Sequence, residues 1–228
     1  MAFCYETHMH TSESSGCARN SAAEQVQAYK ARGYAGIIIT DHFLNGYTTS
    51  PKDLPWAHKM RYVAAGYQNA LEEGERCGLD VFFGWEFNIG GSDLLTYGLD
   101  FDFLCAHPGL DKMPLPEYSA LVRQNGGYLA QAHPYRDAEY IQHKLPVPPQ
   151  FLDGVEVFNA SDRSETNAKA LAFAQKHGLA MQAGSDAHWA DIAFPSGIKL
   201  AQRAKNIFDI IDALKAGRAE LITPRGQA

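Results

Sequence analysis

The chain has 228 residues, of which 46% are hydrophobic, and its formal net charge is −6. A chain of this length and composition can bury a sizeable core, which excludes an intrinsically disordered protein. The acidic balance argues against a general nucleic-acid binder, whose surface would be basic, but it leaves room for a small anionic ligand that metal ions could hold.

No part of the sequence resembles a targeting or membrane segment. Residues 1–6 contain no basic stretch followed by an apolar one, and no apolar run is long enough to span a bilayer. The four cysteines include no C-x-x-C pair, which is typical of reduced thiols. Cys17 is close in sequence to two histidines, but ordinary packing is favoured over metal binding. We expect a cytoplasmic protein with no membrane partner, and the sequence leaves its oligomeric state open.

Short runs rich in β-branched and aromatic residues alternate with helical patterns. The runs predict strands at about 2–8, 35–40, 80–87, 101–106, 128–132, 154–158 and 179–184. The patterns predict helices at about 21–33, 59–77, 116–124, 165–177 and 206–216. The first helix opens on a capping box, Ser21 to Glu24. This alternation predicts an α/β fold with a parallel sheet and helices outside it.

Histidines and carboxylates follow the predicted strands at the points where the strands end. They are His8, His10, His42, Glu86, His107, His133, Asp186 and His188. The carboxyl ends of barrel strands converge on one mouth, whereas an open sheet would spread such residues along an edge. The pattern therefore favours a compact (β/α) barrel with a site for several metal ions. Imidazole and carboxylate ligands together suit Zn²⁺, Mn²⁺ or Fe²⁺ better than Ca²⁺.

Taken singly, each of these residues has a plainer explanation. Asp186 could cap a helix, Glu86 could pair with an arginine, and a histidine before a proline could be buried and hydrogen-bonded. The repetition of a histidine or carboxylate at the ends of several predicted strands favours a metal site. Neighbours on a strand face opposite ways, so only one of Asp41 and His42 can face the site. We predict His42, with Asp41 orienting a ring or a loop amide.

Four motifs in this order resemble the polymerase and histidinol phosphatase (PHP) family. They are His8-x-His10, Thr40-Asp41-His42, His133-Pro134 and Gly184-Ser185-Asp186-x-His188, with Glu86 and His107 between them. The resemblance extends from His8 to about residue 220. It implies a distorted (β/α)7 barrel in a single domain, residues 1–228, with the metal site at the C-terminal ends of the strands.

The resemblance also implies how the ligands are shared among two to three divalent ions, Mn, Zn or Fe. One ion would be held by His8, His10, Glu86 and Asp186, a second by Glu86, His107 and His133, and a third by His42 and His188. The family usually adds a histidine or aspartate to the third position, where this chain has Ser15. A serine hydroxyl is a poor ligand, so this position is expected to be weak, empty, or completed by Glu13 or water.

The function implied is hydrolysis of a small phosphate monoester, as in histidinol-phosphate phosphatases, by a hydroxide that the metal ions generate. Asp186 would act through the metal, and His188 or His42 would help the leaving group if the third position is vacant. Arginines match the shape of a phosphate, and Arg136, Arg19 and Arg163 all lie in loops after strands. Arg136, three residues beyond His133, is the best placed.

Three other functions compete with this one. A cyclic phosphodiesterase, nucleotide phosphodiesterase or exonuclease is the nearest, although the acidic charge makes a nucleic-acid partner less favoured. Amidohydrolases also begin with H-x-H, but they generally need a longer (β/α)8 chain and lack the late Asp186-x-His188. A non-catalytic accessory module should have lost ligands, and this set is almost complete.

Overall fold

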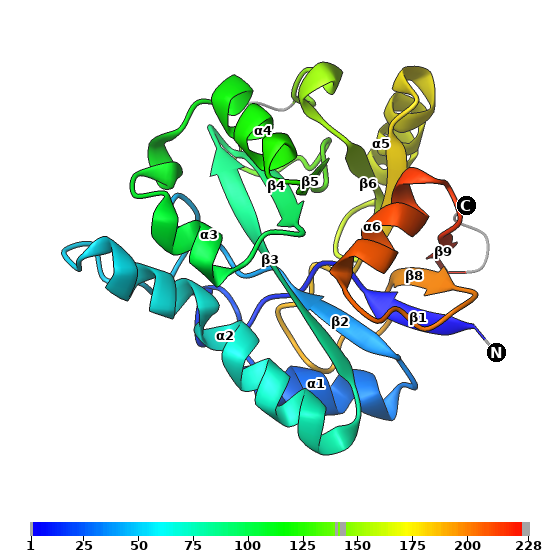
Figure 1. Ribbon diagram of the computed structural model, residues 1–228. Coiled ribbons are helices and arrows are strands. Elements are labelled where there is room, and N and C mark those ends of the chain that lie inside the picture. Colours follow the sequence, from blue (N-terminus) through cyan, green and yellow to red (C-terminus); the bar gives the residue numbers. More distant parts are fainter. Residues whose placement is uncertain (1, 140, 142–144, 225–228) are drawn as a thin grey trace.

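The structure is a computed structural model that describes residues 2–139, 141 and 145–224 (Figure 1). Its elements in chain order are β1 (Phe3–Glu6), α1 (Ala22–Ala31), β2 (Gly36–Ile39), α2 (Trp56–Cys77), β3 (Asp80–Ile89), β4 (Ser92–Tyr97), α3 (Phe101–Ala106), α4 (Leu115–Gln124), β5 (Tyr128–Gln131), β6 (Gly154–Asn159), α5 (Ser164–His177), β7 (Ala180–Gly184), β8 (Gly197–Leu200), α6 (Ile207–Lys215) and β9 (Glu220–Ile222). Two short 3₁₀ helices lie at Leu110–Lys112 and Pro149–Phe151.

The strands form one sheet that curls into a nearly closed barrel. Their order is β7-β6-β5-β4-β3-β2-β1-β8-β9, and β1, β2, β3 run parallel, as do β5, β6, β7. The barrel closes beyond the ends of β1 and β7, where Met9 and Ala187 form a parallel bridge. The backbone amide of His10 donates to Ala187 O at 2.9 Å, and that of Ala187 to His8 O at 3.2 Å. The expected distorted (β/α)7 barrel is therefore confirmed.

The distortion lies in β4, which is antiparallel to both of its neighbours. A two-residue turn joins β3 to β4, and its residues Gly90 and Gly91 have φ of 58° and 91°. Positive φ at both positions is what a tight hairpin turn needs, and glycine adopts it without strain. Strand β4 then occupies the place in the sheet that residues 101–106 were expected to fill.

The prediction of a strand at residues 101–106 is wrong, because this segment is helix α3. The Asp100 side chain accepts a hydrogen bond from Phe103 N at 2.8 Å and so caps the helix. A short apolar run cannot be assigned to strand or helix from its pattern alone, and here the cap decides. The strands β8 and β9, which extend the sheet beyond β1, were also not predicted.

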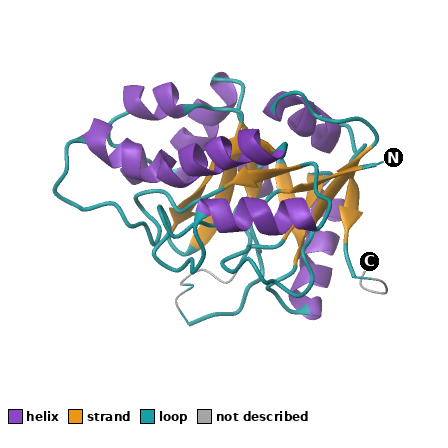
Figure 2. Cartoon of the chain, turned by 90° about the horizontal axis from the view of Figure 1, so that it is seen from below, coloured by secondary structure: helices purple, strands orange, loops and turns teal. Residues whose placement is uncertain are grey.

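The predicted helices are all present, and they lie around the strands (Figure 2). The capping box of α1 is complete, because Ser21 Oγ accepts from Glu24 N while the Glu24 carboxylate accepts from Ser21 N at 2.7 Å. Helix α6 packs its apolar face, including Ile211, against Tyr97 and Tyr128 at the end of the barrel opposite the histidines. No helix in the described part of the chain has the length and apolar character needed to cross a membrane.

Candidate metal centre

The histidines and carboxylates that follow β1, β2, β3, β5 and β7 meet at one end of the barrel. His8 and His10 come after β1, His42 after β2 and Glu86 from β3 itself; His133 comes after β5, and Asp186 and His188 after β7. A bridge between His42 and Glu86 and the closing bridge at Met9 hold the strand extensions in register. The parallel strands thus deliver ligand-type side chains to a common mouth.

Four of these groups lie close together. The Nε2 atoms of His8 and His10 are 3.2 Å apart. Glu86 oxygens lie 3.2 Å from His8 Nε2 and 3.5 Å from His10 Nε2, and Asp186 Oδ1 lies 3.5 and 3.2 Å from the same two nitrogens. Ligands about 2.0–2.1 Å from a tetrahedral cation are about 3.3–3.4 Å apart. The spacing of His8, His10 and Glu86 therefore fits a single divalent ion, and Asp186 Oδ1 lies beside the same two nitrogens.

Glu86 lies at the centre of the cluster. Besides the two histidines after β1, His42 Nδ1 lies 2.9 Å and His133 Nε2 lies 3.3 Å from its carboxylate. Its Oε1 accepts no hydrogen bond within the described residues, although it is buried. Burial alone would raise the pKa of Glu86, but the imidazoles, foremost His8 and His42, hold it well below its usual range. A buried carboxylate that stays ionised beside several ring nitrogens suits a ligand shared between cations.

A second position is formed by Glu86, His133 and Asp93. Asp93 Oδ2 lies 3.8 Å from His133 Nε2, and one ligand atom from each residue can share a cation. Asp93 comes from β4, so it reaches the mouth from the antiparallel strand. Burial and the charge of Glu86 raise the pKa of Asp93 to about 6.

The expectation that His107 contributes to this second position is wrong. His107 ends helix α3, where its Nδ1 donates to Phe103 O at 2.7 Å, and it is not among the residues that could share a cation. The expectation rested on a strand at residues 101–106, and that strand does not exist. Asp93 takes the place that His107 was expected to fill.

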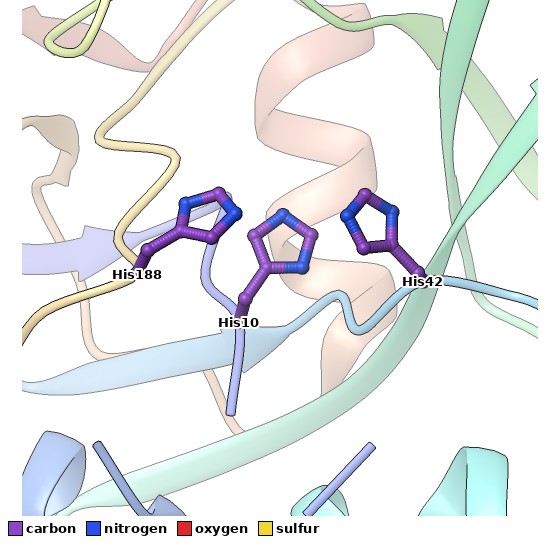
Figure 3. A group of neighbouring side chains, drawn as sticks. All are labelled: His10, His42 and His188. Atoms are coloured by element: carbon purple, nitrogen blue, oxygen red, sulfur yellow. The ribbon is translucent and has the colours of Figure 1, made fainter. Parts of the chain in front are cut away.

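The third group is His10, His42 and His188, whose rings lie side by side with His10 in the middle (Figure 3). The ring centroids of His42 and His188 are 4.5 and 4.4 Å from that of His10. Burial and the neighbouring charges of His188 and His42 lower the pKa of His10 to about 3, so this ring is neutral and able to bind a metal.

Ser15 and Asp41 lie behind this group rather than in it. Asp41 accepts from Thr11 N at 2.7 Å and from Ser15 Oγ at 2.6 Å, and Ser15 Oγ in turn accepts from His42 N at 3.0 Å. Burial raises the pKa of Asp41 to about 6 despite these hydrogen bonds. The pair fixes the loop after His10 and the backbone of His42.

Three of the rings have a hydrogen-bond partner at Nδ1, so each would bind a cation through Nε2. His8 Nδ1 faces Glu156 Oε1 at 3.0 Å, His10 Nδ1 faces Ser15 Oγ at 3.1 Å, and His188 Nδ1 faces Asp186 O at 2.9 Å. Ser15 Oγ already donates to Asp41, and the backbone carbonyl of Asp186 can only accept. In His10 and His188, therefore, Nδ1 carries the proton. Such partners fix the tautomer and orientation of metal-binding histidines.

Above the cluster lies a cavity of about 440 Å³. It is lined by Cys17, His42, Gly46, Tyr47, Glu86, Asn88, Asp93, His133, Arg136, Asp186 and His188. Of the three arginines expected to hold a phosphate, Arg136 is on its wall. Arg19 and Arg163 are exposed and do not line it; Arg163 directly precedes α5, and Arg19 is in the loop after β1.

Two of the three remaining histidines lie elsewhere. His58 is in the first turn of α2 and His177 ends α5. Both are outside the groups of residues that could hold a metal, and His143 lies outside the described residues.

Sequence reasoning missed Asp93 and Glu156 at the site, and it favoured ordinary packing for Cys17. The Gly90-Gly91 pair between two β-rich runs was a hairpin signal that could have located Asp93. Glu156 comes from the interior of β6, which the sequence predicts correctly, but nothing in the sequence says that its side chain meets His8. Cys17 depends on the path of a loop.

Comparisons with known proteins agree with this geometry. A family model described as PHP-associated matches residues 164–191. A probable phosphatase of Caldicellulosiruptor saccharolyticus is 30% identical over an alignment of 210 residues, and the match covers 82% of each chain.

Two solved structures share the fold. One is a two-domain protein of Bacteroides vulgatus containing a predicted PHP-like metal-dependent phosphoesterase, with a TM-score of 0.74, 16% identity and 96% coverage of this chain, which spans 64% of that protein. The other is an amidohydrolase of Chromobacterium violaceum with bound sulfate and no metal, with a TM-score of 0.59, 17% identity and coverage of 96% and 98% of the two chains. From the motifs, the metal centre and the related phosphatase, we conclude that this chain belongs to the PHP family of metal-dependent phosphoesterases.

Proposed function

We propose that this protein hydrolyses a small phosphate monoester with the help of two to three divalent cations, and that histidinol phosphate is the first substrate to test. The observation that carries the proposal is the cavity of about 440 Å³ that combines a histidine and carboxylate cluster with a partly buried arginine. Mn²⁺, Zn²⁺ and Fe²⁺ all suit the donor set. When bound, such ions would supply Lewis acidity toward the phosphoryl oxygens and lower the pKa of a coordinated water.

Arg136 is the residue we assign to the phosphate. Its Nη1 lies 2.7 Å from Asp186 Oδ2, and its Nη2 donates to Asn159 Oδ1 at 3.2 Å. These contacts fix the guanidinium beside a predicted metal ligand with only 15% of the side chain exposed. A planar guanidinium held in this way can bind two phosphate oxygens at once.

The size and surroundings of the cavity support a small substrate over a polynucleotide. The cavity is at the lower end of the range for ligand sites, and the chain carries a net charge of −6. Polynucleotide binding requires a basic track along the backbone, for which this charge is unfavourable. Exposed Tyr47 on the cavity wall offers a flat apolar surface to the leaving group. A small cyclic phosphodiester would fit the same features and is the second candidate.

His42 and His188 are the candidates for moving a proton at the leaving group, as the sequence predicted. Both line the cavity, and 16% and 17% of their side chains are exposed. His188 Nδ1 donates to Asp186 O, so the proton would move at its Nε2. This role stays a prediction, and it applies only where these rings do not bind a cation.

The test is phosphate release by metal-stripped protein, with and without added Mn²⁺, Zn²⁺ or Fe²⁺. The substrates are histidinol phosphate, other small monoesters, a cyclic phosphodiester, a short oligonucleotide and an amide. We expect metal-dependent release from monoesters, with one strongly preferred. Release from the diester or the amide alone would overturn the proposal and select the corresponding alternative.

Arg136→Ala, with Arg163→Ala as the matched control, tests the phosphate contact. We expect KM to rise about 10- to 100-fold in the first variant, the equivalent of a charge-assisted hydrogen bond, and to stay unchanged in the second. Metal content is measured in both, because Arg136 also contacts Asp186. Unchanged kinetics in Arg136→Ala would remove this residue from the substrate site.

A further inference from the structure

The loop after His10 brings Cys17 to the edge of the third group of histidines. Cys17 Sγ lies 3.1 Å from His188 Nε2, and both residues line the same cavity as His42. The ligand atoms of His10, His42 and His188 already lie within 4.8 Å of one another, and Figure 3 shows the last two rings on either side of the first. A thiol and two imidazoles therefore converge at the cavity wall, and Cys17 is half-buried there.

Two other side chains of this loop could have completed the third position, and neither is available. Both oxygens of Glu13 accept from Ala22 N at 3.0 Å, where the carboxylate caps the start of α1. Ser15 Oγ is committed to Asp41 and to the backbone of His42. Of the three candidates in the loop, only Cys17 lines the cavity.

The loop is tied down on both sides of Cys17. Gly16 N donates to Tyr47 O at 2.8 Å, and Arg19 N donates to His188 O at 2.9 Å. The first bond joins the loop to the segment after His42, and the second joins it to the segment that carries His188. These bonds fix the backbone on both sides of Cys17, and the sulfur contacts His188 Nε2.

We propose that Cys17 binds as a thiolate, together with His42 and His188, to a third divalent cation at the cavity mouth, and that this position prefers Zn²⁺ to Mn²⁺. A thiolate is a soft ligand that suits Zn²⁺ and Co²⁺, whereas Mn²⁺ favours oxygen ligands. On binding, the S–H bond breaks, a sulfur–metal bond forms and the proton goes to solvent, with no change in oxidation state. This inference rests on the metal centre of the proposed function, but not on the substrate or the reaction.

Cobalt provides the direct test. Metal-stripped full-length protein is titrated with Co²⁺ while its absorption is recorded, since a thiolate ligand gives a strong near-ultraviolet charge-transfer band that imidazole and carboxylate ligands do not. We expect this band in the wild type and its loss in Cys17→Ser, which keeps the size and shape of the side chain. The weaker visible bands of the remaining cobalt should persist in Cys17→Ser and show that the variant is folded. Cys105→Ser, in helix α3, is the matched control and should keep the band.

A second readout is the number of bound ions and their affinity, measured by elemental analysis and competition with a chelator. Cys17→Ser should bind one equivalent of Zn²⁺ fewer, or bind it at least tenfold more weakly, while its Mn²⁺ binding changes little. A wild-type protein that binds Co²⁺ without the charge-transfer band, or a band that survives in Cys17→Ser, would overturn the assignment. Neither readout uses a substrate, so failure of the phosphatase proposal would leave this result standing, and the reverse.

Discussion

The chain uses the same three-residue pattern, Ala-His-Pro, in two places with different outcomes. At the end of β5, His133 turns into the barrel mouth with φ of 28°, and its ring reaches Glu86 at 3.3 Å. At the end of α3, His107 turns back on its own helix and donates to Phe103 O. The first is part of the metal centre, and the second closes a helix.

The difference comes from partners that the local sequence does not contain. The segment before His133 pairs with β4 and β6, so it is a strand whose end lies at the mouth. The segment before His107 is capped by Asp100 and has no strand partner within the described residues. A proline can end either a strand or a helix at the preceding residue. The Ala-His-Pro pattern therefore predicts where an element ends but not whether it is a strand or a helix.

The largest expected effect separates these two histidines directly. His133→Ala should lower kcat/KM by about 1,000-fold, because the loss of a metal ligand removes several kcal/mol of transition-state stabilisation. His107→Ala should stay within about twofold of the wild type. Phosphate release at saturating metal measures both, together with metal content. A comparable loss in both variants would return His107 to the site.

Asp93 tests the finding that a residue of the antiparallel strand replaces His107. Asp93→Asn keeps the shape of the side chain but offers a weaker ligand, and we expect about a 100-fold loss of activity that excess metal partly restores. Asp102→Asn, on the exposed face of α3, is the control and should leave activity unchanged. An active Asp93→Asn protein with full metal content would show that the second position does not use this carboxylate.

The sequence predicts those features that depend on local pattern. The capping box at Ser21, six of the barrel strands and the convergence of polar residues at strand ends all follow from spacing and residue type. The positions of Asp93 and Cys17 were not predicted. Asp93 depends on an antiparallel strand that only the Gly90-Gly91 hairpin signal could have located, and Cys17 depends on the path of a loop. The His107 error has the same origin, because the choice between strand and helix was made by a cap and by sheet pairing.

Glu156 extends the comparison from ligands to the groups that position them. Its two oxygens accept from His8 Nδ1 and from His133 N, each at 3.0 Å, so one buried carboxylate fixes the start of two ligand segments. Glu156→Gln should weaken metal binding about 10- to 100-fold, as loss of such a partner usually does. The same change at Glu165, on helix α5, should have no effect. Metal affinity measured by competition is the readout, and an unchanged value would show that the rings are oriented by packing alone.

The smallest expected effect concerns stability, and it is the effect in which removal of His107 matters. His107 contributes a 2.7 Å hydrogen bond to Phe103 O and a ring contact with Phe103 at 4.2 Å between centroids. His107→Ala should therefore lower the free energy of unfolding of the metal-stripped protein by about 1 kcal/mol. Urea denaturation measures it, and metal content in the same preparation should equal that of the wild type. If instead His107→Ala lost metal without losing stability, the imidazole would have to reach the centre in solution, and α3 would have to end differently. If removing His107 lowers stability but not activity, and removing His133 lowers activity, the two His-Pro segments have different roles.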